Sequence, residues 1–216
     1  MPAEQLSLVD RAAYSATFDP NFSSLRRTEL GFDGWVDYAP RWLDGHSILF
    51  DRLRREGTWS SGRRLMYERF VDVPRLLGDL PQGSRPAVVD AMAEVLSARY
   101  GARFDAVSLA LYRDGADSVA YHQDKGLQDM PESTLAIVSV GEPRSFRLRP
   151  LGGGASLAFR CGWGDLLVMG GTCQRHWEHG VPKARQAGPR MSIMFRCSTD
   201  WPSRVPPGSL RVDSAV

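Results

Sequence analysis

The apolar positions follow a helical period in the first half of the chain and a strand-like pattern in the second. Residues 44–56 and 86–100 repeat apolar side chains three or four positions apart, which predicts one helix in each stretch. Gly57 follows the first stretch and Gly101 the second, and glycine commonly ends helices. We therefore expect two helices there, the second being the more regular.

Short β-rich runs replace the helical period after Gly101. Most are bounded by Gly, Pro or Asp, and no helical stretch interrupts them. The expected strands cover residues 107–112, 119–122, 134–140, 145–149, 156–160, 165–169 and 190–197. Many short strands without intervening helices are typical of a sandwich, barrel or jelly roll. The expected fold class is therefore mainly β with flanking helices (α+β).

Two earlier stretches have weaker patterns. Residues 1–40 mix aromatic residues with turn formers and show no sustained period, so we expect irregular packing segments and one short strand. Residues 58–77 interleave aromatic residues with Arg, as a surface does when it stacks bases and neutralises phosphates. A basic hairpin packed on the domain would show the same pattern, and the sequence leaves both interpretations open.

The composition changes this picture little. A chain of 216 residues with 43% hydrophobic and 24% charged residues predicts one globular domain over residues 1–216. The net charge of +2 does not by itself indicate a nucleic-acid binder. The N-terminus lacks a signal-peptide pattern, and no apolar run approaches the roughly 20 residues that span a bilayer. Three scattered Cys without Cys-x-x-Cys spacing indicate reduced thiols, so we expect a cytoplasmic protein without membrane contact.

Candidate metal ligands begin with His122 and Asp124. On an extended strand, residues i and i+2 point to one face, so this pair would present an imidazole beside a carboxylate. That is two-thirds of a facial triad, whose third member is normally a distant His. His179 is the candidate for this place, and His176 is its rival because residue type does not separate them.

A candidate anion site follows ten residues after His179. Arg190 on a strand near a metal-bound His could bind a carboxylate bidentately, and the Ser192 hydroxyl could assist. The ligand would be a dicarboxylate whose other end binds the metal. Strand alternation places residues 190, 192, 194 and 196 on one face, so Arg196 would share it.

With these residues the chain resembles the Fe(II)- and 2-oxoglutarate-dependent dioxygenases, and among them the AlkB-like nucleic-acid dealkylases. The resemblance runs from about residue 59 to 196. Its strongest segments are residues 109–115, 122–124, 139–141, 164–169, 177–182 and 190–196. It implies a double-stranded β-helix (jelly roll) core over residues 104–197, with the metal ligands at one open end. Residues 1–103 would supply helices that buttress one sheet from outside and a nucleotide-recognition lid.

The resemblance also implies roles for the candidate residues. His122, Asp124 and His179 would hold Fe(II), because the family's third ligand directly precedes Gly-Val-Pro. The residues that would bind 2-oxoglutarate are Tyr112, Arg190 and Ser192, with Arg196 near its inner carboxylate.

The implied activity is oxidative demethylation of alkylated nucleic-acid bases, with 2-oxoglutarate and O2 as co-substrates and formaldehyde as a product. The partner would be methylated DNA or RNA, whose target base must be flipped out or single-stranded. Trp59, Arg63, Arg64 and Tyr67 lie in the stretch that resembles the lid and are candidate substrate contacts. We expect the protein to act as a monomer.

Two departures from the family leave the substrate open. Ala110 stands where the family usually has Asn, which removes one hydrogen bond to 2-oxoglutarate. Gly126 stands where an acidic residue commonly contacts the target base. A 2-oxoglutarate-dependent hydroxylase or demethylase of a small molecule or protein is therefore an alternative. A non-catalytic module that binds nucleic acid or a partner is a second, against which the complete triad and Arg190 argue.

Overall fold

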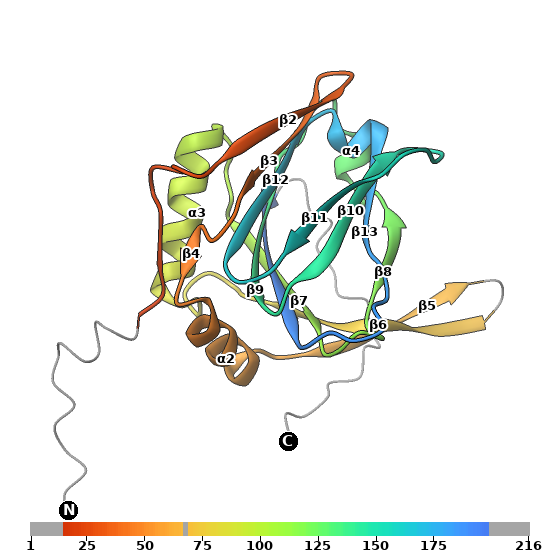
Figure 1. Cartoon of the computed structure of the whole chain (residues 1–216). Coiled ribbons are helices and arrows are strands. Elements are labelled where there is room, and N and C mark those ends of the chain that lie inside the picture. Colours follow the sequence, from red (N-terminus) through yellow and green to blue (C-terminus); the bar gives the residue numbers. More distant parts are fainter. Residues whose placement is uncertain (1–14, 67–68, 199–216) are drawn as a thin grey trace, which may run out of the picture.

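Two antiparallel sheets face each other across the centre of the molecule (Figure 1), in a computed structural model that describes residues 15–66 and 69–198. The larger sheet contains, in spatial order, β2 (Arg26–Gly31), β3 (Gly34–Ala39), β12 (Asp165–Gly171), β9 (Leu135–Gly141), β14 (Arg190–Arg196), β7 (Ala106–Tyr112), β6 (Arg69–Asp79) and β5 (Ser60–Met66). The smaller sheet contains β11 (Leu157–Cys161), β10 (Arg144–Pro150), β13 (Trp177–Val181) and β8 (Val119–His122). A further pair joins β1 (Thr17–Phe18) to β4 (Leu43–Asp44).

The strands from β7 to β14 form a jelly roll. Four of them lie in the larger sheet and four in the smaller one, and the chain passes repeatedly from one sheet to the other. This arrangement confirms the expected fold class. All the strands expected after Gly101 are present within two residues of their expected ends.

Helices α2 (His46–Glu56) and α3 (Ala87–Tyr100) lie where the helical period predicts them and cover the outer face of the larger sheet (Figure 1). Leu53 and Met92 from these helices pack in one core cluster with Leu109 and Ile193 of the sheet. A second cluster, with Ile137 and Leu148 among its members, fills the space between the two sheets. The central strands β7, β9, β12 and β14 of the larger sheet are therefore covered on both faces, which explains their almost continuous apolar runs.

Strand β14 shows how the two clusters divide one strand. Met191, Ile193 and Phe195 belong to the outer cluster that contacts the helices. The alternate residues, Arg190 and Ser192 among them, point toward the smaller sheet, as the strand period requires. The expected shared face of residues 190, 192, 194 and 196 is therefore present, and it lies inside the jelly roll.

Within residues 15–40 the expectation of irregular segments was wrong, because β2 and β3 form a hairpin at the end of the larger sheet, with a shift in register between Glu29 and Gly31. Four of the six β2 residues are exposed polar or charged side chains on an edge strand, so no alternating pattern marks the strand in the sequence. The turn between the strands holds Phe32 and Asp33 at φ values of 53° and 61°. Such a left-handed turn matches the twist of a tight hairpin.

The stretch at residues 58–77 does form a hairpin, made by β5 and β6, which continues the larger sheet beyond β7. It projects from the body of the molecule (Figure 1). The side chains of residues 63–73 are outside the described part of the structure, as are residues 67 and 68 altogether.

Residues 173–181 differ from the expected uninterrupted series of strands. A short helix, α4 (Cys173–His176), leads directly into β13, which the sequence patterns did not predict. Strand β13 carries Trp, Glu and His, so its polar composition hides its place in the smaller sheet. In residues 15–66 and 69–198, no helix is long and apolar enough to cross a bilayer.

Candidate active site

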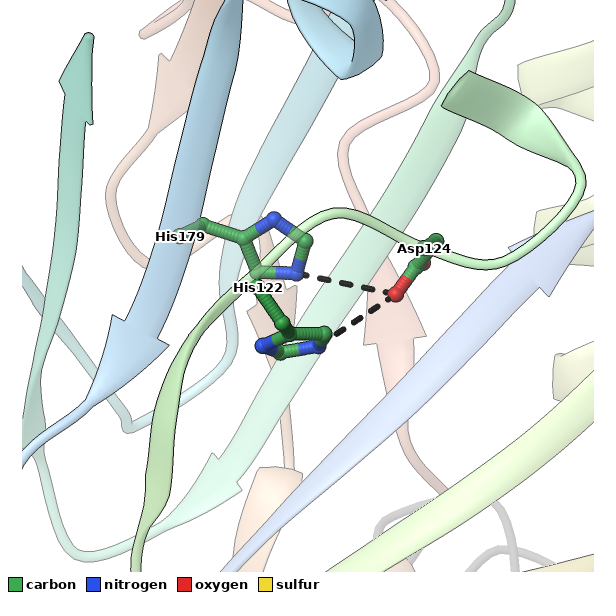
Figure 2. Close-up of side chains that lie close together, drawn as sticks. All are labelled: His122, Asp124 and His179. Atoms are coloured by element: carbon green, nitrogen blue, oxygen red, sulfur yellow. Dashed lines mark ion pairs between the residues drawn. The ribbon is translucent and has the colours of Figure 1, made fainter. Parts of the chain in front are cut away.

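His122, Asp124 and His179 come together at one open end of the jelly roll. Their ligand atoms all lie within 4.8 Å of one another. Figure 2 shows both imidazole rings turned toward one carboxylate oxygen, with His122 Nε2 at 3.4 Å and His179 Nε2 at 3.8 Å from Asp124 Oδ1. Two imidazoles and one carboxylate on one side of a metal form the facial triad that is typical of non-haem Fe(II) oxygenases.

The backbone fixes these side chains through partners that lie far apart in sequence. His122 and His179 pair directly across β8 and β13, which brings their rings to 4.4 Å between centroids. Strand β8 ends at His122, so Asp124 is not on the strand as the i, i+2 argument assumed. Its backbone N–H instead donates to the side-chain oxygen of buried Gln174, at 2.9 Å. Gln174 is a supporting residue that the sequence analysis missed, although it lies only five positions before His179.

The second nitrogen of His122 is also occupied. Its Nδ1 lies 2.9 Å from the carbonyl oxygen of Ala120, which accepts a hydrogen bond when that nitrogen carries the proton. This tautomer leaves Nε2 unprotonated and directed at the site, as a metal requires.

Arg196 contacts the metal-ligating carboxylate. Its Nη2 donates to Asp124 Oδ2 at 2.8 Å, and its Nη1 donates to Ser108 Oγ at 3.0 Å. Burial by itself would raise the pKa of Asp124, but the Arg196 charge holds it well below its ordinary value. Asp124 is therefore ionised, with Oδ2 held by Arg196 and Oδ1 directed at the two histidines.

His179, in contrast to the ionised Asp124, is neutral. Burial lowers the pKa of His179 to about 3. The charges of Arg196 and Arg75 act in the same direction. The ring also stacks on Phe146, with 5.4 Å between centroids. A neutral, immobilised imidazole is the form that coordinates a metal.

The rival histidine is elsewhere. His176 ends helix α4, and its ring lies against Phe32 of the β2–β3 turn, with 4.9 Å between centroids. It is not part of the cluster that could hold a metal. The structure therefore brings His179, and not His176, to the other two ligands.

A second group of polar side chains surrounds Tyr112 on the inner face of the larger sheet. Arg190 is fully buried, and its Nη2 donates to Ser139 Oγ at 2.7 Å. Its Nε and Nη1 are buried without any hydrogen-bond partner. A buried guanidinium with unused donors is costly, so this arrangement fits an acidic ligand that the molecule binds.

Arg144, near Tyr112, holds two backbone segments together. Its guanidinium is buried and donates to the carbonyl oxygens of Asp114, Asp117 and Pro182 at 2.7–2.9 Å. These contacts tie the loop before β8 to the segment after β13. Arg144 therefore holds together the two segments that carry His122 and His179.

The comparisons with known proteins agree with this donor set. The sequence model of the 2OG-Fe(II) oxygenase superfamily matches residues 51–200. The chain belongs to this superfamily. Its members use Fe(II), 2-oxoglutarate and O2. The site fits the first two, because His122, Asp124 and His179 would hold the iron and the unpaired donors of Arg190 would hold a carboxylate.

Curated relatives lie in the AlkB-like branch of the 2OG-Fe(II) oxygenases. The chain is 27% identical over 236 residues to the DNA oxidative demethylase ALKBH2 of Arabidopsis thaliana, an alignment that covers 89% of this chain and 75% of the relative. It is 29% identical over 118 residues to the DNA oxidative demethylase ALKBH2 of Homo sapiens, covering 50% of this chain and 45% of that relative. The chain therefore spans most of the plant relative and less than half of the human one.

Among solved structures, the fold resembles that of OsALKBH1. The TM-score is 0.53 at 16% sequence identity, and the match covers 79% of this chain and 99% of that one. At this identity the likeness concerns the fold alone, and it agrees with the jelly-roll architecture.

Of the four expected lid residues, the structure describes the side chain of Trp59 only. Trp59 is buried in the outer core with 6% of its surface exposed, and its indole N–H donates to the carbonyl oxygen of Arg54 at 3.1 Å. This burial leaves little indole surface for a nucleobase and corrects its expected role as a substrate contact. The side chains of Arg63 and Arg64, and Tyr67 altogether, lie outside the described residues.

The structure shows where the two departures from the family pattern, Ala110 and Gly126, lie. Ala110 is buried on the inner face of β7, two residues from Tyr112, and pairs with Ser192 of β14. Gly126 has φ 88° and ψ −38°, a conformation that side chains with a Cβ rarely adopt. The loop conformation after Asp124 therefore depends on the glycine that replaces the usual acidic residue.

A pocket of about 260 Å³ has Arg196 among its lining residues. Asp79, Arg85, Asp105 and Ser108 are among its lining residues, and none of the three metal ligands lines it. The ligand cluster and the buried arginines therefore define the candidate active site, and this pocket lies next to it.

Proposed function

We propose that the protein is an oxidative dealkylase that removes methyl groups from nucleic-acid bases. The observation that carries the proposal is the similarity to a DNA oxidative demethylase along 89% of this chain, together with a complete His122, Asp124 and His179 ligand set. Iron with 2-oxoglutarate and O2 supplies the oxidation of a C–H bond. Hydroxylation of an N-methyl carbon gives a hemiaminal that releases formaldehyde and restores the base.

The chain's own residues then bind, orient and exclude water. Arg190, with Ser192 beside it and Tyr112 opposite it, would bind the distal carboxylate of 2-oxoglutarate from the dry side of the larger sheet. Arg196 keeps Asp124 ionised and directs one of its oxygens to the metal position. The imidazoles of His122 and His179 complete the ligand set.

The β5–β6 hairpin supports a nucleic-acid substrate in this proposal. It projects from the body of the molecule and carries Arg63 and Arg64 on strand β5. Positive charge along a projecting hairpin would contact phosphates, while the target base enters the jelly roll flipped out or from a single strand. Arg63, Arg64 and Tyr67 stay candidate substrate contacts.

The test measures coupled products. Purified protein with Fe(II), 2-oxoglutarate and O2 is incubated with an oligonucleotide that contains 1-methyladenine or 3-methylcytosine, and with the same oligonucleotide unmethylated. We expect succinate, carbon dioxide and formaldehyde in equal amounts with the methylated strand only. The His122→Ala variant is the blank. Succinate formation that ignores the methyl group would keep the oxygenase and reject the nucleic-acid substrate.

A second candidate keeps the oxygenase chemistry and changes the substrate to a small molecule or a protein side chain. Gly126 favours it, because no acidic side chain stands there to accept a hydrogen bond from a base amino group. The two candidates differ in salt dependence. Affinity for an oligonucleotide falls steeply with ionic strength when phosphates are contacted, so absent or salt-independent binding would favour the second candidate.

A further inference from the structure

Unused hydrogen-bond donors on two arginines converge around Tyr112. Arg190 has two buried nitrogens without a partner, and Arg75 has one, its Nε. Arg75 Nη1 donates to the Tyr112 hydroxyl oxygen at 3.1 Å. Neither arginine forms an ion pair with a carboxylate of the described residues. Since buried donors are nearly always satisfied, these donors are available to a ligand that enters the jelly roll.

The sheet register explains why the two arginines meet. Tyr112 of β7 pairs directly with Arg190 of β14 on one side. On the other side β7 pairs with β6, where Leu76 lies opposite Leu111 and Leu77 opposite Ala110. Continuing this register by one residue brings Arg75 level with Tyr112. Three adjacent strands, β14, β7 and β6, thus each present one polar side chain at the same level.

These side chains point to the interior of the jelly roll. Tyr112 and Ala110 belong to the cluster between the sheets, and Leu77 packs against that cluster. Arg75 lies two residues before Leu77, so it shares the same face of its strand. The guanidinium carbons of Arg190 and Arg75 lie 5.2 Å and 5.9 Å from the centre of the Tyr112 ring. The ring is therefore flanked by two positive charges inside the molecule.

We propose that Arg75 is a further 2-oxoglutarate-binding residue, which closes one carboxylate pocket with Tyr112 and Arg190. A carboxylate accepts up to about four hydrogen bonds, and the pocket offers the Tyr112 hydroxyl, two nitrogens of Arg190 and one of Arg75. Because the Tyr112 oxygen accepts the hydrogen bond from Arg75, its own O–H is left to donate to the ligand. Arg75 thus binds the carboxylate and orients its neighbour.

Ala110 supplies no hydrogen-bond donor from its position on β7, and Arg75 can replace that donor. Its methyl group is buried on the same face as Tyr112 and offers no hydrogen bond to a ligand. The neighbouring strand β6 supplies a donor through Arg75 instead. The inference rests on the superfamily assignment and does not depend on which primary substrate the enzyme oxidises.

The test separates the two ends of the co-substrate by equilibrium binding. Protein loaded with Mn(II) is titrated by calorimetry with 2-oxoglutarate and with 2-oxobutyrate, which keeps the keto acid and lacks the distal carboxylate. We expect Arg75→Ala to weaken 2-oxoglutarate binding about 10- to 100-fold, as for loss of a hydrogen bond to a charged group. Binding of 2-oxobutyrate should stay unchanged. Arg52→Ala, at an exposed helix position, is the matched control and should change neither.

Several results would overturn the proposal. An unchanged 2-oxoglutarate affinity in Arg75→Ala would remove the residue from the pocket. An equal loss for both ligands would assign Arg75 a general structural role. If the alanine variant does not fold, Arg75→Gln is titrated in its place, with the same expected split between the two ligands.

A double-mutant cycle tests whether Arg75 orients Tyr112. Arg75→Ala and Tyr112→Phe should together weaken 2-oxoglutarate binding less than the product of their separate effects, because each removes part of one shared contact. Fully multiplicative losses would contradict this orientation. Both measurements use no primary substrate, so their failure is distinguishable from failure of the dealkylase proposal.

Discussion

Arg196 Nη2 lies 2.8 Å from Asp124 Oδ2, so a single guanidinium holds the oxygen that faces away from the two histidines. The other carboxylate oxygen, Oδ1, is the one nearest to both Nε2 atoms. The residues lie 72 positions apart and are both buried. The contact therefore fixes which carboxylate oxygen is presented to a metal before any metal binds.

We expect Arg196→Gln to weaken Mn(II) binding about tenfold, since outer-shell partners of metal ligands typically contribute 10- to 100-fold to affinity. The amide cannot supply the charge that keeps Asp124 ionised. Titration with Mn(II), followed by electron paramagnetic resonance without 2-oxoglutarate, measures the effect. Arg52→Gln is the control, and equal affinities in the two variants would contradict the assignment.

The two neighbouring histidines make a paired test of the metal site. His179→Ala should abolish measurable Mn(II) binding, because it removes one of three ligands. His176→Ala should leave the affinity within about twofold of the parent, because its ring contacts Phe32 and not the site. A comparable loss in both variants would mean that the histidines exchange roles on metal binding.

Ser139 should affect stability and 2-oxoglutarate binding through its hydrogen bond with Arg190. Its hydroxyl accepts the hydrogen bond from Arg190 Nη2 in a fully buried position, so Ser139→Ala leaves a third guanidinium nitrogen without a partner. We expect an unfolding free energy lower by about 1–3 kcal/mol and a several-fold higher KM for 2-oxoglutarate with little change in kcat. Urea unfolding and steady-state kinetics measure these. Ser84→Ala, on an exposed loop, should change neither quantity.

Asp117 gives a pH dependence of stability. Burial by itself would raise the pKa of Asp117, but its hydrogen bonds and ion pair with Arg113 hold it below the ordinary value of 3.8. A lowered folded-state pKa contributes stability that is present above the unfolded-state pKa and is lost as pH falls through the folded-state pKa. Asp117→Asn should therefore cost about 1–2 kcal/mol at neutral pH. The difference from the parent should shrink below about pH 4, as urea unfolding at several pH values would show. A difference that is constant with pH would contradict the ion pair.

Gly126 tests whether the loop tolerates an acidic residue. Gly126→Asp should lower the unfolding free energy by about 1–2 kcal/mol, because φ 88° is strained for any residue with a Cβ. Lys125→Asp places the same charge one position earlier and is the control. Equal stability of the two variants would show that the loop changes conformation without cost.

The strand pattern after Gly101 and the two helical periods could be predicted from the sequence, because burial on one or both faces of an element imposes a local repeat. The motifs around His122, Asp124 and Arg190 could be found for another reason, which is that the chemistry restricts residue type at short spacings. Strands β2 and β13 could not, because one is an exposed polar edge strand and the other carries functional polar residues. Neither position produces a hydrophobic repeat.

The sequence was enough to predict both helices, the strands after Gly101 other than β13, and the residue types that would hold the metal and the carboxylate. The partners that those residues meet come from the three-dimensional fold: His179 opposite His122, Gln174 on the Asp124 backbone, Ser139 on Arg190, and Arg75 beside Tyr112. These pairings depend on the register between strands that are distant in the chain. Register is a property of the whole sheet and leaves no local signal in the sequence.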